Sequence, residues 1–306
     1  MAHIADSGAI AEGLPFTRMR RTGPLRRGLR LARRKPLGAI ALLIVVGLAF
    51  LAAFAELIAP YDPIQPDFGS LLQPMSAMHP FGTDNLGRDM LSRIIFGARS
   101  SLIVGFAVAV GGRVLSTALG LLAGFIGGKT DAIIMRVVDG MLAFPSLILA
   151  IALVTALNPS LLNVIIAITV TSVAGATRVT KSAVLAVKQE AYVEAARAMG
   201  CSSLRIMWQH VLPNIMALII VLTSLTFAQA ILAEAALSFL GLGPPPPNPS
   251  WGTMLSWEGR STFKIAPWLA IWPGVAISLA VYSFNMLGDA LRDVLDPRLR
   301  GVGRVS

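Results

Sequence analysis

Residues 36–55, with the sequence PLGAIALLIVVGLAFLAAFA, contain no charged side chain. As an α-helix they would extend about 30 Å, which is the thickness of the hydrocarbon core of a bilayer. The apolar region of a signal peptide is shorter, about 7–15 residues, so we expect a retained membrane helix. The composition agrees, because 55% of the 306 residues are apolar and 14% are charged, whereas soluble domains carry about 25% charged residues. The sequence predicts an integral membrane protein.

Further apolar runs follow the first one. Backbone polar groups must be satisfied within lipid, so only helices or a closed barrel can span it. Barrel strands alternate in polarity over about ten residues, whereas these runs are continuous and longer. We therefore expect an all-α fold with six transmembrane helices, at residues 36–59, 99–127, 132–157, 160–183, 213–240 and 267–289.

The basic residues indicate the orientation. If the N-terminus is cytoplasmic, 20 of the 26 Lys and Arg residues fall in cytoplasmic segments, as the positive-inside rule requires. Both termini are then expected inside the cell. The net charge of +10 does not indicate a nucleic-acid partner, because no basic patch is interleaved with aromatic residues. We expect a basic cytoplasmic tail (1–35), the first helix with an extracytoplasmic segment (36–98), a five-helix core (99–290) containing a cytoplasmic loop (188–210), and a C-terminal cytoplasmic tail (291–306).

The sequence contains no pattern typical of catalysis or metal binding. The three histidines are far apart, and Cys201 is the only cysteine, so we expect no metal site. Gly128-Lys129-Thr130 resembles the end of a phosphate-binding loop, but Ala123 stands where that loop requires glycine. We therefore expect a non-catalytic chain that binds neither ATP nor another cofactor.

Two long segments, 60–98 and 242–266, are expected outside the cell. Thr83 or Asp84 is a candidate N-cap for a short amphipathic helix that runs to Phe96 and lies in the membrane interface. Trp251, Trp257, Trp268 and Trp272 are typical of an interfacial aromatic belt.

The second predicted helix carries small residues at every fourth position. They are Gly112, Ser116, Gly120, Gly124 and Gly128. Spacing by four places them on one ridge, which predicts close backbone approach to a neighbouring helix.

Ionisable residues inside the membrane are functional candidates by default. Arg113, Asp139 and Glu234 are predicted either to line a path or gate through the membrane or to form an internal pair, Arg113 with Asp139 or with Glu234. Pairing is the favoured interpretation for Arg113, because it avoids the desolvation of a lone charge. Further polar candidates for the path are Thr171, Ser172 and Gln229, although Ser and Thr also merely bond within helices.

The segment between the fourth and fifth helices is polar but favours helix. Residues 188–199 predict one helix, ended by Gly200 as a left-handed cap. Ser202 or Ser203 is expected to cap a second helix over 204–209, and Pro213 to begin the fifth membrane helix. The apolar residues of this segment are Val193, Ala196, Met199, Leu204, Ile206 and Trp208. A helix–Gly–helix hairpin of this kind is a candidate docking element for a soluble partner, whereas an ordinary loop would not need two helices.

This segment resembles the EAA motif of ABC importer permeases. Glu194-Ala195-Ala196 is followed by Gly200 and then by His210-Val211-Leu212-Pro213, with His210 where the general motif has Ile. Residues 81–89, 234–243, 249–252 and 285–298 are similar to the C-type permeases of dipeptide and oligopeptide importers. The resemblance implies an ATPase-coupling loop made of Glu190, Tyr192, Val193, Glu194, Ala195, Ala196, Met199, Gly200, Leu204, Leu212 and Pro213.

The resemblance also implies a fold and partners. The chain is expected to have the type I ABC importer permease fold, in the plasma membrane of a prokaryote, and to form half of a path for di- or oligopeptides. A second homologous permease, two ABC ATPase subunits that hold ATP and Mg, and an extracytoplasmic solute-binding protein would complete the complex. Three alternatives stay open: an importer of nickel or another small solute, a secondary transporter that uses Asp139 or Glu234 as a proton-coupling carboxylate, and a membrane scaffold.

Overall fold

The computed structural model describes residues 35–256 and 262–295. Most of the two expected tails and Trp257 therefore lie outside the described residues. In chain order the helices are α2 (Pro36–Ala53), α3 (Ala55–Ile58), α4 (Met90–Leu121), the π-helical turn η1 (Leu122–Ile126), α5 (Gly128–Leu142), α6 (Ser146–Leu157), α7 (Leu161–Lys188), α8 (Ala191–Ala198), α9 (Ser203–Ile206), the π-helical turn η2 (Met207–Val211), α10 (Leu212–Phe239), α11 (Trp251–Leu255) and α13 (Trp268–Leu295). Across those residues the only strand-like feature is an isolated bridge between Thr83 and Asp89.

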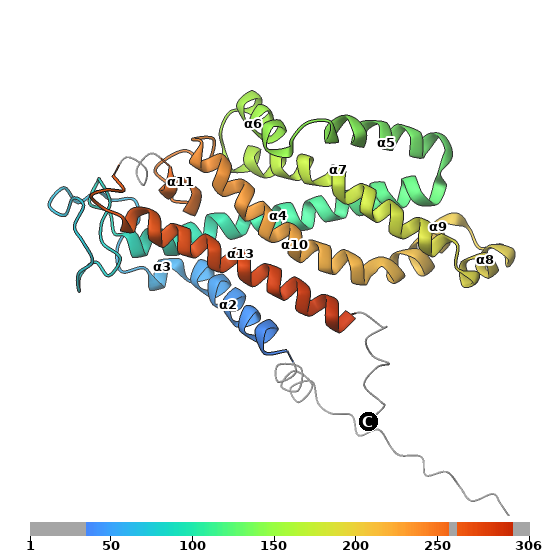
Figure 1. Ribbon diagram of the computed structural model, residues 1–306, viewed down its shortest axis with the longest axis horizontal. Helices are drawn as coiled ribbons and strands as arrows, with labels where there is room; N and C mark the ends of the chain where they lie inside the picture. Colours follow the sequence, from blue (N-terminus) through green and yellow to red (C-terminus); the bar gives the residue numbers. More distant parts are fainter. Residues whose placement is uncertain (1–34, 257–261, 296–306) are drawn as a thin grey trace, which may run out of the picture. The chain divides into compact units, whose positions relative to one another are not determined.

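The described part of the chain contains five helical runs that are long and apolar enough to cross a membrane, and a bent pair that makes a sixth. The bent pair is α5 and α6, which meet at 92° (Figure 1). The span predicted over 132–157 is therefore present as a bent pair of helices and not as one continuous helix. Pro145 explains the break, because proline lacks an N–H and disfavours helical geometry in the residue before it.

The helix α4 begins at Met90, earlier than the spanning helix that the sequence predicts at residue 99 and later than the short helix predicted from Thr83 or Asp84. Asp89 is its N-cap, and its side chain accepts a hydrogen bond from the Ser92 N–H. From Met90 the helix runs without interruption into the membrane-spanning part. The separate interfacial helix ending at Phe96, and its cap at Thr83 or Asp84, are therefore wrong: this amphipathic segment is the first part of α4.

The ridge of small residues on α4 packs against α7. A Cβ atom at Gly120 would lie 2.6 Å from the Thr180 Cβ, and one at Gly124 would lie 2.9 Å from a methyl group of Val184. No side chain larger than hydrogen fits at these two positions without moving the helices apart. The predicted close approach is confirmed there, but Gly128 begins α5 and has nothing within 4 Å.

The helix α10 packs between α4 and α13. A Cβ atom at Gly105 of α4 would lie 2.7 Å from the ring of Phe227, and that ring stacks on Phe284 of α13 at 3.7 Å between centroids. The cluster around these rings also includes Leu48 and Ala52 of α2. Van der Waals packing of this kind is what associates helices in lipid, where tails are as apolar as side chains.

Three of the four tryptophans predicted for an interfacial belt pack against other parts of the described chain. The indole of Trp251 is buried and donates to the Ile94 carbonyl at 3.0 Å. Trp268 donates to the Thr83 carbonyl at 3.1 Å, and Trp272 stacks on Phe81. These rings hold α11 and α13 to α4 and to the segment that precedes it.

Candidate functional site

A short helical hairpin projects between α7 and α10; we call residues 189–211 the knob (Figure 1). Its first helix, α8, ends at Gly200, whose φ is +81°. The Gly200 N–H bonds to the Arg197 carbonyl and the Cys201 N–H to the Ala196 carbonyl. These two bonds are those of a Schellman cap, which glycine adopts most easily. The predicted cap at Gly200 is confirmed.

The second half of the knob continues into the membrane. Ser202 caps α9 by accepting from the Arg205 N–H. The helices α9, η2 and α10 then form one helical run from Ser203 to Phe239. Within this run α10 begins at Leu212, one residue before the predicted start at Pro213, and it continues directly from the π-helical turn. A π turn changes the hydrogen-bond spacing locally.

One face of the knob is packed onto the ends of the spanning helices. Val193, Ala196 and Ile206 are buried in a cluster with Val184 of α7. This cluster also contains the ends of α4 and α10. In addition, Lys188 donates to the Phe125 carbonyl at 2.7 Å. The packing makes the knob a rigid extension of the bundle.

The other face of the knob is apolar and exposed. The exposed fractions of Met199, Leu204 and Trp208 are 78%, 65% and 65%, and Tyr192 is also exposed. The six apolar residues that the sequence indicates thus divide into a buried set and an exposed set. Partial burial, and secondarily the charge of Glu190, raise the pKa of the Tyr192 hydroxyl, so it stays neutral at physiological pH.

The other residues of the predicted coupling loop surround this face. Glu190 occupies the N-cap position of α8, although its side chain makes no capping bond. Glu194, Ala195 and Pro213 are exposed, and Leu212 is partly buried against the cluster. The structure therefore places the sequence-predicted loop residues in the knob, except for Leu212 and Pro213, which begin α10.

Arg113 lies within the spanning part of α4 and is 6% exposed. Its guanidinium donates to the Thr226 hydroxyl of α10 at 2.8 Å. The Nε and Nη1 atoms have no hydrogen-bond partner among the described residues. The predicted pair of Arg113 with Asp139 or Glu234 does not form, so that hypothesis is wrong for this conformation.

Asp139 and Glu234 have other partners. Asp139 lies on the exposed face of α5 and forms an ion pair with Arg178 of α7. Glu234 is 1% exposed and accepts from the Ser238 hydroxyl at 2.7 Å and the Ser101 hydroxyl at 3.2 Å. The bend between α5 and α6 and the rotation of each helix place these carboxylates away from Arg113. The sequence alone does not predict the bend or the rotations.

The predicted polar path residues lie on two helices. The hydroxyls of Thr171 and Ser172 donate to carbonyls within α7, at Ile168 and Thr169. Gln229 of α10 is exposed. The intrahelical bonds fit the structural interpretation of Thr171 and Ser172, whereas Gln229 is available to a partner or solute.

A network of buried charges that the sequence did not predict lies just before α4 and in its first turn. Asp84 is fully buried and accepts from Arg88 Nε at 2.6 Å, with Arg93 Nε at 3.4 Å. Asp89 accepts from Ser92 and lies 3.0 Å from His79 Nδ1. Buried carboxylates are stable only when paired and hydrogen-bonded. The alternation of acidic and basic residues over 84–93 was the available signal.

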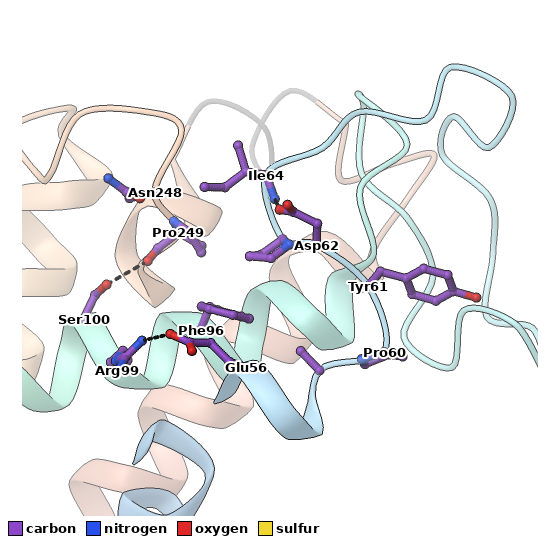
Figure 2. A pocket seen from close by; sticks show the side chains of 12 residues that line it. Glu56, Pro60, Tyr61, Asp62, Ile64, Phe96, Arg99, Ser100, Asn248 and Pro249 are labelled. Carbon is purple, nitrogen blue, oxygen red and sulfur yellow. Dashed lines mark hydrogen bonds and ion pairs between the residues drawn. The ribbon is translucent and has the colours of Figure 1, made fainter. Parts of the chain in front are cut away.

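A pocket of about 650 Å³ opens beside this network, at the same end of the bundle (Figure 2). It lies between the segment after α3, the first turns of α4 and the Asn248–Pro249 segment. Glu56 and Arg99 face each other at 3.0 Å on one side, and Asp62 lies on the other. Among the described residues no group of three His, Cys, Asp or Glu side chains could hold a metal ion.

Two family models match this chain. The model described as "Binding-protein-dependent transport system inner membrane component" matches residues 116–301. The model described as "N-terminal TM domain of oligopeptide transport permease C" matches residues 23–74.

Similar curated proteins cover most of the chain. The "Dipeptide transport system permease protein DppC" of Alkalihalophilus pseudofirmus is 44% identical over 277 residues, which are 90% of this chain and 91% of that protein. The "Di/tripeptide transport system permease protein DppC" of Pseudomonas aeruginosa is 46% identical over 85% of this chain and 87% of its own length. The "Glutathione transport system permease protein GsiD" of Pectobacterium atrosepticum is 42% identical over 90% and 92%.

A solved structure has the same fold. A chain of the inward-facing MetNI methionine ABC transporter matches with a TM-score of 0.58 and 18% identity, over 68% of this chain and 98% of that chain. The fold and the knob thus define a multi-pass, type I ABC importer permease. The chain belongs to the family of binding-protein-dependent transport system inner membrane components. It is a non-catalytic membrane subunit of a bacterial importer, and ATP hydrolysis belongs to separate subunits.

Proposed function

We propose that this chain forms half of the translocation path of an importer of di- or oligopeptides, with a second homologous permease as the other half. The proposed substrate class rests on the relatives that are 42–46% identical to this chain. Their names specify dipeptides, tripeptides and glutathione. All three are short peptides or peptide-like compounds. An extracytoplasmic binding protein would deliver the solute to the end of the bundle that holds the 60–89 segment.

We infer that the knob is the contact with an ABC ATPase subunit and lies in the cytoplasm. The basic residues favour this orientation, because 20 of the 26 Lys and Arg residues then lie inside the cell. By chain connectivity, the start of α2 and the end of α13 lie on the same side as the knob, so both tails would be cytoplasmic. The domain organisation then follows: a tail over 1–35, the first helix and outer segment over 36–98, the core over 99–290 and a tail over 291–306.

The exposed apolar face of the knob supports this docking role. Large exposed side chains on a rigid element are typical of a protein interface, and aromatic residues are enriched at its centre. The buried face is continuous with the ends of α4, α7 and α10. A displacement of the knob by a partner would therefore move the spanning helices. ATP and Mg bound by two such partners would drive that displacement.

The path itself is the interface between this chain and the second permease. Arg113, Asp139, Thr171, Ser172, Gln229 and Glu234 are the candidate path or gate residues. Gln229 is the best placed of them, because it is exposed on a spanning helix. Glu234 is enclosed by hydroxyl groups, so we assign it a structural role at the outer end of α10.

Two measurements test the proposed function. Proteoliposomes that contain the whole complex and its binding protein should accumulate a labelled dipeptide on addition of ATP, and unlabelled dipeptide should compete whereas Ni²⁺ should not. Competition by Ni²⁺ alone would assign the chain to metal import. Uptake driven by a proton gradient without ATP would identify a secondary transporter.

The docking role has its own test. Trp208→Ser should lower the affinity of the permease pair for the ATPase subunits by about 30-fold or more, because buried aromatic side chains at interface centres contribute about 2 kcal/mol or more. Gln209→Ser, at the neighbouring exposed position, is the matched control and should leave assembly unchanged. Equal assembly of both variants would contradict docking at this face.

A further inference from the structure

The pocket in Figure 2 has charged groups of both signs. Glu56 of α3 and Arg99 of α4 meet at its edge, with Nη1 and Oε1 3.0 Å apart. Their side chains are 74% and 46% exposed, so both keep free hydrogen-bonding capacity toward the pocket. The Asp62 carboxylate accepts one bond, from the Ile64 N–H at 2.8 Å. Two carboxylates and one guanidinium therefore surround one cavity of about 650 Å³.

These charges lie at the expected boundary of the hydrocarbon core. Glu56 directly follows the uncharged stretch 36–55, and Arg99 directly precedes the long apolar run of α4. Arginine at this level reaches the phosphate layer of a bilayer. The pocket is thus at the depth of lipid headgroups rather than in open water.

Exposed apolar side chains are also present on the helices that carry or precede the two charged residues. On α2 and α3 they are Leu43, Val46, Phe50, Phe54 and Leu57, and on α4 they are Ile103, Phe106, Val110 and Val114. The α4 set follows Arg99 at spacings of three and four, so it continues the face that carries this residue. The α4 set provides an apolar surface for an acyl chain on the helix face that carries Arg99.

We propose that this pocket binds the headgroup of a zwitterionic phospholipid that carries a primary ammonium group, of the phosphatidylethanolamine type. Arg99 binds the phosphate through its planar fork of N–H donors. Glu56 and Asp62 accept hydrogen bonds from the ammonium group. The volume fits, because ligand pockets are typically 300–1,000 Å³.

The charge balance selects among headgroups. An anionic lipid such as phosphatidylglycerol has no cation to face the two carboxylates. The quaternary ammonium of phosphatidylcholine has no N–H to donate. The primary ammonium satisfies both acceptors, so the site discriminates by hydrogen bonding as well as by charge. This inference does not depend on the identity of the transported solute.

The test uses the whole purified complex in nanodiscs of phosphatidylcholine containing a minor fraction of labelled phosphatidylethanolamine. Lipid that remains with the complex after mild delipidation is counted by native mass spectrometry. We expect labelled phosphatidylethanolamine to be retained over phosphatidylcholine, and Glu56→Gln and Arg99→Gln to weaken this retention by about tenfold, as the loss of one charge-assisted hydrogen bond predicts.

The control is Lys181→Gln, which breaks another ion pair, with Asp131 at 2.8 Å, far along the chain from the pocket. It should leave retention unchanged. Arg99→Lys keeps the charge without the fork and should give an intermediate value, and thermal unfolding of each variant establishes that it is folded. Equal retention of the two lipids by the wild-type complex would overturn the proposal. So would unchanged retention in folded Glu56→Gln and Arg99→Gln, or displacement of the lipid by free dipeptide, which would assign the pocket to the solute.

Discussion

The backbone conformation of Gly200 allows a direct test of the proposed coupling role of the knob. Gly200 has φ of +81°, and a Cβ atom built there would have nothing within 4 Å. A substitution at this position therefore meets no steric neighbour and acts only through the backbone. The left-handed conformation costs an L-residue roughly 1–2 kcal/mol, and more for a β-branched side chain.

We expect Gly200→Val to uncouple transport from ATP hydrolysis. A cost of 1–2 kcal/mol reduces the population of the native knob relative to alternatives by about 5–30-fold. In proteoliposomes the number of solute molecules imported per ATP hydrolysed should fall, while ATP hydrolysis continues. Gly200→Asn should give a smaller effect, because asparagine tolerates the left-handed region.

A second glycine in the same conformation provides the matched control. Gly241, directly after α10, also has φ of +81° and open space around it, but it lies at the opposite end of that helix from the knob. Gly241→Val should lower thermal stability by a similar amount and leave the ratio of import to hydrolysis unchanged. A normal ratio in Gly200→Val, or equal uncoupling in both variants, would refute the assignment of the knob as the transmission element.

Three further outcomes are expected. Gly120→Leu should separate α4 from its neighbour and destabilise the permease by about 1–3 kcal/mol in thermal unfolding, whereas Gly111→Leu, where space is open, should not. Asp84→Asn should remove the buried negative charge that Arg88 and Arg93 face, cost about 3–5 kcal/mol and expose the 60–89 segment to protease. Arg113→Met should be neutral or raise the unfolding temperature, because it removes a buried cation with two unbonded atoms; a loss above about 2 kcal/mol would instead reveal a strong partner for this side chain.

The sequence predicted the features that depend on local composition. The apolar runs predicted the spanning helices, because every segment that crosses lipid must satisfy its own backbone hydrogen bonds. Gly200 predicted the end of α8, because few other residues adopt a positive φ without strain. The four-residue spacing of glycine gave the contact between α4 and α7, since positions one turn apart lie on one face.

The features that the sequence did not predict depend on helix rotation and on bends. Pro145 could have indicated a break, but the apolar residues on both sides of it favoured one continuous span. In the structure α5 and α6 meet there at 92°. Arg113 and Asp139 are both in apolar runs, yet one faces Thr226 and the other Arg178. Tertiary packing decides which side chains of different helices meet. A single sequence does not predict these pairs.

The uninterrupted run from Ser203 to Phe239 has a mechanical consequence. Its 37 residues make a rod about 55 Å long, with the docking tip at one end and Glu234 near the other. A tilt of only about 10° about its midpoint would carry each tip roughly 5 Å in opposite directions, by the rise of a helix. A small displacement of Trp208 would then move the Glu234 end of the helix, which contacts Ser101, in the opposite direction.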